Sequence, residues 1–305
     1  MLLVLFFILS AAGYFVGGYF TDFALKRGNA QDPMAPPAAC VSILDANVKL
    51  PAKPEAASTV WQIASADGLR LTATQFSPAK PTHRWVILVH GYGRNQQNTW
   101  DYAKTYLEHG YAVLTPDLRA SGDSEGQYVT MGTLESEDLQ KWVERIAAVD
   151  PEARIVLHGV SMGAATVMMA SARPDMPVNL AAVVEDCGYT SATAMFSMQL
   201  KSMFNLPSFP IIDCMDFMSR QKTGTALSKA APIEAVRQTK VPMLFIHGDA
   251  DKLVPYTMMQ ELYDASGAPA KEQLTVKGAG HAEAKAADAA MYYRTVFAFI
   301  DRYTE

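Results

Sequence analysis

The stretch RIVLHGVSMGAATVMMA, residues 154–170, decides the interpretation of the whole chain. Apolar residues typical of a strand lead into GVSMG (159–163), and helix-forming residues follow directly. Glycines two positions before and after Ser161 suit a sharp strand-to-helix turn, because side chains there would clash with the neighbouring backbone. Such a turn exposes the hydroxyl at the carboxyl end of a sheet, facing a helix N-terminus. An ordinary glycine-flanked turn is the alternative, and Ser161 is our candidate nucleophile.

Strand and helix patterns alternate on both sides of this turn. Apolar runs of strand length stand at 60–64, 69–76, 85–90, 111–116, 154–159, 180–186, 241–248 and 272–278. Helical patterns lie at 98–109, 133–149, 164–172, 257–265 and 284–303. The first two strands flank Ala66-Asp67-Gly68, which is typical of a hairpin turn. We therefore predict an α/β fold with a mostly parallel, doubly wound sheet, and a small helical lid at 190–232, where the alternation breaks.

The chain begins with LLVLFFILSAAGYFVGGYF at 2–20, nineteen residues without a charge. A helix needs about this length to cross the hydrocarbon core of a bilayer. We predict a transmembrane anchor over 1–25, a linker over 26–58 and the main domain over 59–305. A cleaved signal peptide is the main alternative, although no basic residue precedes the run, and a buried core helix is the other. Lys26 and Arg27 favour the cytoplasm for that end, but a single N-terminal anchor often exports the domain attached to it, and we favour the outer face of the cell membrane.

Composition and cysteine spacing exclude several classes of protein. Half of the residues are hydrophobic and 19% are charged, so the chain can bury a large core. The net charge of −5 is spread without a basic stripe, which excludes nucleic acid as a partner. Cys40, Cys187 and Cys214 form no C-x-x-C pair and no ligand spacing with histidine, so we expect no metal, no cofactor and free thiols. Pairing of Cys187 with Cys214 outside the cell is the alternative.

A serine nucleophile needs a base that takes its proton during attack, and the chain has six histidines. Five of them have a structural explanation at or within a strand, or stand beside the wrong element: His83, His90, His109, His158 and His247. His281 follows the last strand in GAGH (278–281), where a loop can carry it over Ser161. We predict that His281 is the base.

The acid that orients the base is expected between the serine and the histidine in chain order. Asp251 occurs in HGDADKLVP (247–255), directly after a strand, where its carboxylate can accept the imidazole N–H. Asp249 is the main alternative, and Glu185 or Asp186 at the preceding strand end is a weaker one.

An oxyanion formed at Ser161 needs two preorganised donors. We predict the backbone N–H groups of Met162, which follows the nucleophile, and of Tyr92 in HGYG (90–93), which ends the strand at 85–90. The Tyr92 side chain either lines the pocket or is an exposed loop tyrosine.

The motifs HGYG, DLRASGDS (117–124), GVSMG, EDCGYTS (185–191), HGDADKLVP and GAGH occur in this order. In this respect the chain resembles the α/β-hydrolases of the serine aminopeptidase and monoacylglycerol lipase-like branch, and more narrowly its membrane-anchored bacterial members, over about 59–303. The resemblance implies the α/β-hydrolase fold, a triad of Ser161, Asp251 and His281, and Tyr92 and Met162 as oxyanion donors. One departure is RASG at 119–122, where relatives usually carry a glycine and a histidine, and it leaves the details of the pocket open.

The predicted lid is rich in flexible and aromatic apolar side chains: Met195, Met198, Met203, Met215, Met218, Phe196, Phe204, Phe209 and Phe217. They suit a pocket for an acyl chain, or they simply pack the lid onto the main domain. We therefore expect a serine hydrolase that cleaves carboxylic esters with a partly apolar acyl group. An aminopeptidase, for which Asp213 and Asp216 would have to face the substrate amine, and a non-catalytic binding protein are the alternatives.

Overall fold

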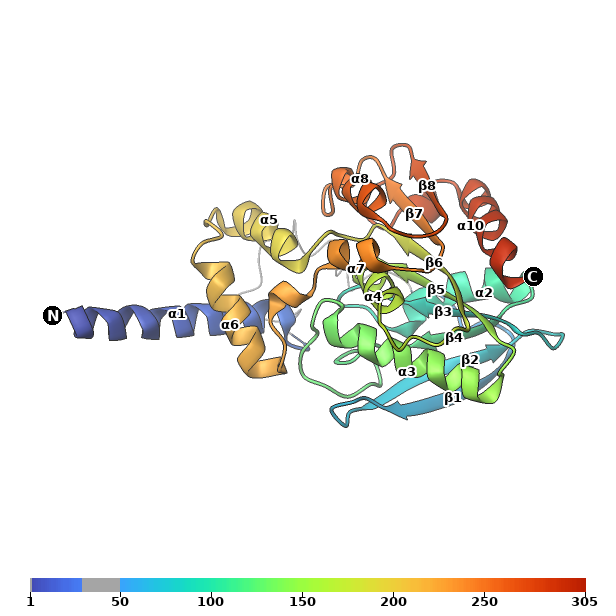
Figure 1. Ribbon diagram of the computed structural model, residues 1–305, viewed down its shortest axis with the longest axis horizontal. Coiled ribbons are helices and arrows are strands. Elements are labelled where there is room, and N and C mark those ends of the chain that lie inside the picture. The colour runs from blue at the N-terminus through green and yellow to red at the C-terminus, as the bar shows by residue number, and fades with distance from the viewer. Residues whose placement is uncertain (1, 29–49) are drawn as a thin grey trace.

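The computed structural model describes residues 2–28 and 50–305, with side chains from residue 11 onward. Its strands form one sheet in the order β1-β2-β4-β3-β5-β6-β7-β8 (Figure 1). Strand β2 is antiparallel to both of its neighbours, β1 and β4, and all other neighbouring strands are parallel. The strands are β1 (Ala57–Ala64), β2 (Arg70–Ser77), β3 (Arg84–Val89), β4 (Ala112–Pro116), β5 (Arg154–Val160), β6 (Leu180–Asp186), β7 (Met243–Gly248) and β8 (Lys271–Val276).

The helices cover both faces of this sheet and form the insertion between β6 and β7. They are α1 (Leu2–Leu25), η3 (Gln96–Thr99), α2 (Trp100–Glu108), α3 (Thr133–Val149), α4 (Met162–Ser171), α5 (Ala192–Phe204), α6 (Ile211–Thr223), η4 (Leu227–Lys229), α7 (Pro232–Gln238), α8 (Tyr256–Ala265), α9 (Ala284–Ala287) and α10 (Ala289–Thr304). The predicted doubly wound, mostly parallel sheet is confirmed.

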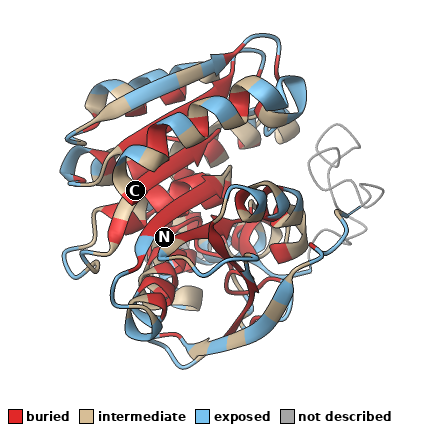
Figure 2. Ribbon diagram, turned by 90° about the vertical axis from the view of Figure 1, so that its right-hand side faces the viewer, coloured by how far each residue is buried: buried red, intermediate tan, exposed pale blue. Residues whose placement is uncertain are grey.

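The core consists of two apolar layers, one on each face of the sheet, because successive strand side chains point in opposite directions. On β3, Trp85, Ile87 and Val89 pack with α3, α4, α7 and α8, whereas Val86 and Leu88 pack with α2 and α10. Both faces of the central strands are therefore buried, which explains their continuous apolar sequences. Figure 2 shows this buried sheet between helices whose outer faces are exposed.

One predicted helix, at 284–303, is interrupted in the structure. Asp288 separates α9 from α10, and its side chain accepts a hydrogen bond from the Met291 amide at the start of α10. A short acidic side chain at this position satisfies a free amide of the first helical turn, so it starts a new helix. The apolar periodicity of the sequence continues across Asp288, so it does not predict that the helix is interrupted there.

The lid predicted at 190–232 contains α5, α6 and η4 and ends where α7 begins. In Figure 1, the lid helix α6 crosses α1, which projects from the body of the molecule. The two helices approach closely because Gly17 has no side chain, and a Cβ there would lie 2.5 Å from the carbonyl oxygen of Cys214 on α6. Of the predicted linker at 26–58, residues 29–49 lie outside the described residues, as does Cys40.

The uncharged run at 2–20 forms most of α1. Among the residues that the structure describes, no helix combines the length and the hydropathy needed to cross a membrane.

Candidate active site

Ser161 stands at the turn between β5 and α4, as predicted from the GVSMG motif. Its backbone has φ of 58° and ψ of −118°, a combination that residues other than glycine rarely adopt. Cβ atoms at the flanking glycines would lie 2.2 Å from Gly163 O and 2.1 Å from Val89 O, so only glycine fits. The Ser161 amide donates to Asp186 O at 2.8 Å, which ties the strained turn to β6. The serine is thereby held at the carboxyl end of the sheet with its hydroxyl accessible.

The structure brings His281 into contact with Ser161, which is 120 residues away in the sequence, and with Asp251, which is 30 residues away. His281 Nε2 lies 2.8 Å from Ser161 Oγ, and His281 Nδ1 lies 2.7 Å from Asp251 Oδ2. A proton on Nδ1, held by the carboxylate, leaves Nε2 free to accept the serine proton. This is the geometry that a nucleophile, its base and an orienting acid require.

Asp251 is buried in the loop after β7 and stays ionised there. Its Oδ1 accepts hydrogen bonds from the amides of Leu253 and Val254 at 2.8 and 2.9 Å. Burial alone would raise the Asp251 pKa, but the hydrogen bonds with His247 and His281 outweigh it and hold that pKa well below its usual range. A permanently charged acid stabilises the imidazolium that forms when His281 takes the serine proton.

The three alternative acids make other contacts. Asp249 Oδ1 accepts from the Gly278 amide at 2.6 Å, so it braces the loop that carries His281. Asp186 is buried and accepts from the Tyr292 hydroxyl at 2.8 Å. Glu185 is also buried and accepts from the Gly188 amide at 3.0 Å, and burial raises its pKa to about 8.

His247, for which the sequence predicts a structural place at a strand end, belongs to the same cluster as Asp251. Its buried Nε2 lies 3.2 Å from Asp251 Oδ2 and 2.9 Å from Val254 O. Burial by itself lowers the pKa of His247, but the hydrogen bond to Asp251 outweighs it and leaves that pKa above its usual value. The signal in the sequence was the spacing of four residues between His247 and Asp251 around a tight loop.

The HGYG loop places Gly91 beside the nucleophile, because a Cβ on Gly91 would lie 3.3 Å from Ser161 Cβ. The His90 ring holds the loop in place through two hydrogen bonds. Its Nε2 accepts from the Leu118 amide at 3.0 Å, and its Nδ1 donates to Gly91 O at 2.9 Å. Burial lowers the pKa of His90, so it is neutral and keeps this tautomer.

The predicted oxyanion donors are the amides of Tyr92 and Met162. Outside regular helices and strands, no described backbone carbonyl accepts a hydrogen bond from either amide. An amide without such a partner can donate to a substrate oxygen. The Tyr92 side chain is half-buried rather than exposed, and its hydroxyl donates to Ala24 O, at the end of α1, at 2.7 Å.

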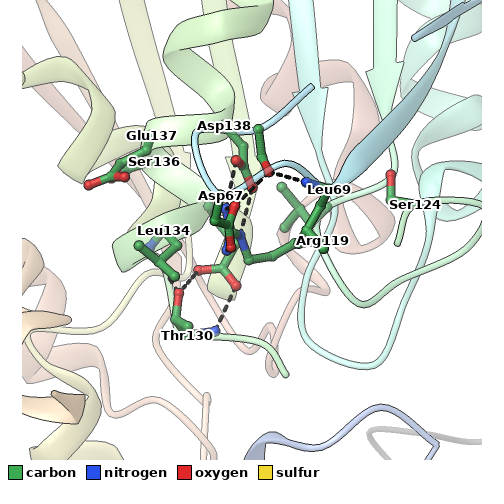
Figure 3. A network of polar contacts seen from close by, with 12 residues as sticks. Asp67, Leu69, Arg119, Ser124, Thr130, Leu134, Ser136, Glu137 and Asp138 are labelled. Atoms are coloured by element: carbon green, nitrogen blue, oxygen red, sulfur yellow. Dashed lines mark hydrogen bonds and ion pairs between the residues drawn. The ribbon is translucent and has the colours of Figure 1, made fainter. Parts of the chain in front are cut away.

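Arg119 of the RASG segment is buried and forms an ion-pair network. Figure 3 shows Arg119 between Asp67 of the β1–β2 turn and Asp138 of α3. Its guanidinium donates to both Asp138 carboxylate oxygens, at 2.7 and 2.8 Å, and to both of Asp67, at 3.0 and 3.2 Å. Burial raises the Asp138 pKa to about 6 against the lowering effect of Arg119. Arg119 thus joins the hairpin to the helical layer.

The lid side chains divide into two groups. Met195, Met215 and Met218 are buried, and Met198 and Phe196 pack against the main core layer, which agrees with a packing role. Phe209 and Phe217 instead face outward, with 76% and 55% of their surface exposed. Those two are therefore not pocket residues in this structure.

Among the described residues, no group of three or more His, Cys, Asp or Glu side chains is arranged to hold a metal ion.

Residues 86–290 match the alpha/beta hydrolase family, and the chain belongs to that family. The uncharacterized protein YqkD of Bacillus subtilis is 27% identical over 245 residues, which cover 80% of this chain and 79% of YqkD. The esterase Pf2001 of Pyrococcus furiosus superposes with a TM-score of 0.65 at 22% identity, covering 82% of this chain and 94% of the esterase. The acylaminoacyl peptidase of Pyrococcus horikoshii superposes with a TM-score of 0.60 at 16% identity, covering 85% of this chain and 43% of the peptidase. At these identities, the two structures are evidence for the fold alone.

Proposed function

We propose that this protein is a serine hydrolase that cleaves carboxylic esters through an acyl-serine intermediate. The observation that carries the proposal is the hydrogen-bonded chain from Ser161 Oγ to His281 to Asp251, at 2.8 and 2.7 Å. Ser161 Oγ attacks the ester carbonyl while His281 Nε2 takes its proton, and the oxyanion accepts from the amides of Tyr92 and Met162. His281 then gives the proton to the leaving alcohol as the C–O bond breaks. Water, deprotonated by His281, releases the acid and restores Ser161.

An ester is favoured over a peptide by the contacts of Asp213 and Asp216, the two acidic residues of the lid. A peptidase that binds a substrate amine needs a free carboxylate facing the site. Asp216 instead accepts from the Ser228 amide at 2.6 Å, and Asp213 is exposed on α6. The fold is shared with an esterase and with an acylaminoacyl peptidase, so the fold alone leaves both open. Within the family, the motifs support the serine aminopeptidase and monoacylglycerol lipase-like branch.

A non-catalytic binding protein on the same scaffold is disfavoured by the complete set of polar groups. A protein without turnover has no need for a strained serine, a histidine in contact with it and a buried carboxylate. All three are present and connected.

Membrane attachment through α1 is a further part of the proposal, with the main domain on the outer face. Helix α1 exposes the large apolar side chains of Tyr14, Phe15, Val16 and Tyr19. The lid meets α1 at Gly13 and Gly17, within the uncharged run. Residues 2–12 rise only about 16 Å at about 1.5 Å per residue, roughly half of the hydrocarbon core. If a bilayer holds residues 2–12, the lid, which contacts α1 at Gly13 and Gly17, lies at the surface of that bilayer.

The test is a panel of p-nitrophenyl esters beside aminoacyl p-nitroanilides, with Ser161→Ala as the inactive control. We expect the purified full-length chain to hydrolyse the esters and to leave the anilides largely intact, and the alanine variant to lose at least about a thousandfold in kcat. Faster turnover of the anilides would replace the esterase by the peptidase. Turnover of neither class would favour the binding protein.

A further inference from the structure

The C-terminal end of α1 is built into the main domain. The last carbonyls of a helix have no partner inside the helix and must find one elsewhere. Leu25 O accepts from the Val129 amide at 2.9 Å, and Ala24 O accepts from the Tyr92 hydroxyl at 2.7 Å. Arg27 follows and donates through its guanidinium to the carbonyls of Gly122 and Ser124. Leu25 and Ala24 are buried, so this end of α1 is docked against the domain rather than joined to it by a free tether.

Of these contacts, the Tyr92 hydroxyl reaches the proposed oxyanion loop. Gly91 and Gly93 flank Tyr92, and Gly93 has φ of 65°, so the loop backbone has little stiffness of its own. The His90 ring fixes the carbonyl of Gly91 on one side. The hydrogen bond from the Tyr92 hydroxyl to Ala24 O of α1 fixes the next residue of the loop, Tyr92 itself. Burial raises the Tyr92 pKa to about 12, so the hydroxyl remains a donor at neutral pH.

The same turn of α1 holds the lid. Thr21 is fully buried, and its hydroxyl donates to Met215 O of α6 at 3.4 Å. Lys222, at the end of α6, pairs with Asp22, which also accepts from the Tyr128 hydroxyl at 2.8 Å. One helix end therefore contacts both the lid and the loop beside Ser161.

We propose that the C-terminal end of α1 positions the oxyanion loop through the hydrogen bond from the Tyr92 hydroxyl to Ala24 O. Tyr92 then has two roles: its amide contacts the substrate oxygen, and its hydroxyl positions that amide. The N-terminal helix is accordingly part of the catalytic apparatus in addition to any role at a membrane. The catalytic part of this inference rests on the proposed serine hydrolase function.

The test compares Tyr92→Phe with Tyr128→Phe in the full-length chain. Each change removes one tyrosine hydroxyl that bonds to the end of α1, and only Tyr92 belongs to the oxyanion loop. The first readout is amide hydrogen exchange of the segment 90–95. The second is kcat and KM for p-nitrophenyl butyrate. A thermal melt of both variants verifies that they are equally folded.

We expect Tyr92→Phe to exchange its loop amides several-fold faster and to lose about tenfold in kcat, a fraction of the hundredfold or more that follows complete loss of an oxyanion donor. KM should stay within twofold, because the loop acts on the transition state. Tyr128→Phe should stay within twofold of the wild type in all three quantities.

Unchanged exchange in Tyr92→Phe would overturn the proposal, as would faster exchange without a loss of kcat. Equal effects of the two variants would also overturn it, since they would mean general loosening of α1. If the wild type cleaves no ester, the proposed function fails by itself, and the exchange measurement still decides whether α1 holds this loop.

Discussion

Replacing Asp251 by Asn separates its role from that of its neighbour Asp249. In the structure, Asp251 Oδ1 accepts from two amides and Oδ2 accepts from His281 Nδ1. An Asn keeps the first pair through its carbonyl oxygen, so its NH₂ group must face His281. The imidazole then carries its proton on Nε2, donates to Ser161 Oγ, and can no longer accept the serine proton.

The expected loss in kcat is about 10⁴-fold, or about 5.5 kcal/mol of transition-state stabilisation, because the wrong tautomer removes the general base while the fold remains. Asp249→Asn is the matched control, since the side-chain carbonyl oxygen of the Asn can still accept from the Gly278 amide. We expect it to stay within about threefold of the wild type, a loss of less than about 1 kcal/mol. The assay is kcat/KM for p-nitrophenyl butyrate at pH 7 to 8, with circular dichroism of each variant. The reasoning fails if Asp251→Asn keeps more than a tenth of the wild-type activity, or if Asp249→Asn is equally damaged.

Three further predictions concern stability, pH and the lid. Arg119→Met should destabilise the fold by about 3–5 kcal/mol in urea unfolding, because it leaves Asp138 buried and unpaired, and a second change of Asp138 to Leu should restore much of that loss. Burial raises the pKa of Glu185 to about 8, so in the folded protein this carboxyl stays protonated at pH values where it is ionised in the unfolded chain. The contribution of Glu185 to the free energy of unfolding is therefore complete below its unfolded pKa of about 4.3 and is lost as the pH rises toward 8. Glu185→Gln should therefore show a smaller decline in unfolding free energy between pH 5 and 8 than the wild type, and equal slopes would refute this. Met198→Lys should lower kcat/KM for octanoate esters more than for acetate esters if Met198 contacts the acyl chain, since each buried methylene contributes about 0.8 kcal/mol; a uniform loss would mean that it only packs the lid.

The sheet, the serine turn and the position of His281 beside Ser161 could be predicted from local patterns. Glycines at 159 and 163 report a close backbone approach that no other residue permits, and His281 stood alone after the last strand. Asp251 followed from chain order, although Asp249 stayed open because two residues in one loop cannot be told apart without its fold. These features depend on short stretches of chain, so the sequence contains them.

The contacts that the sequence analysis missed join distant segments. Tyr92 and Ala24 are 68 residues apart, and Arg119 is 52 from Asp67. Nothing near Tyr92 in the sequence indicates that its hydroxyl reaches a helix end, because that contact depends on where α1 docks. A histidine at a buried strand end is usually structural, so the sequence alone does not connect His247 with Asp251; the fold of the next loop brings them together.

The most direct test of the central claim is covalent labelling with a fluorophosphonate, which reacts with a serine only when a base activates it. Intact mass and peptide mapping of the full-length wild type should show a single phosphonyl adduct on Ser161. His281→Ala should label at least about a hundredfold more slowly, because it removes the base and leaves the nucleophile in place. An adduct on another residue, or equal labelling of Ser161 with and without His281, would contradict the assignment of Ser161 and His281 as nucleophile and base.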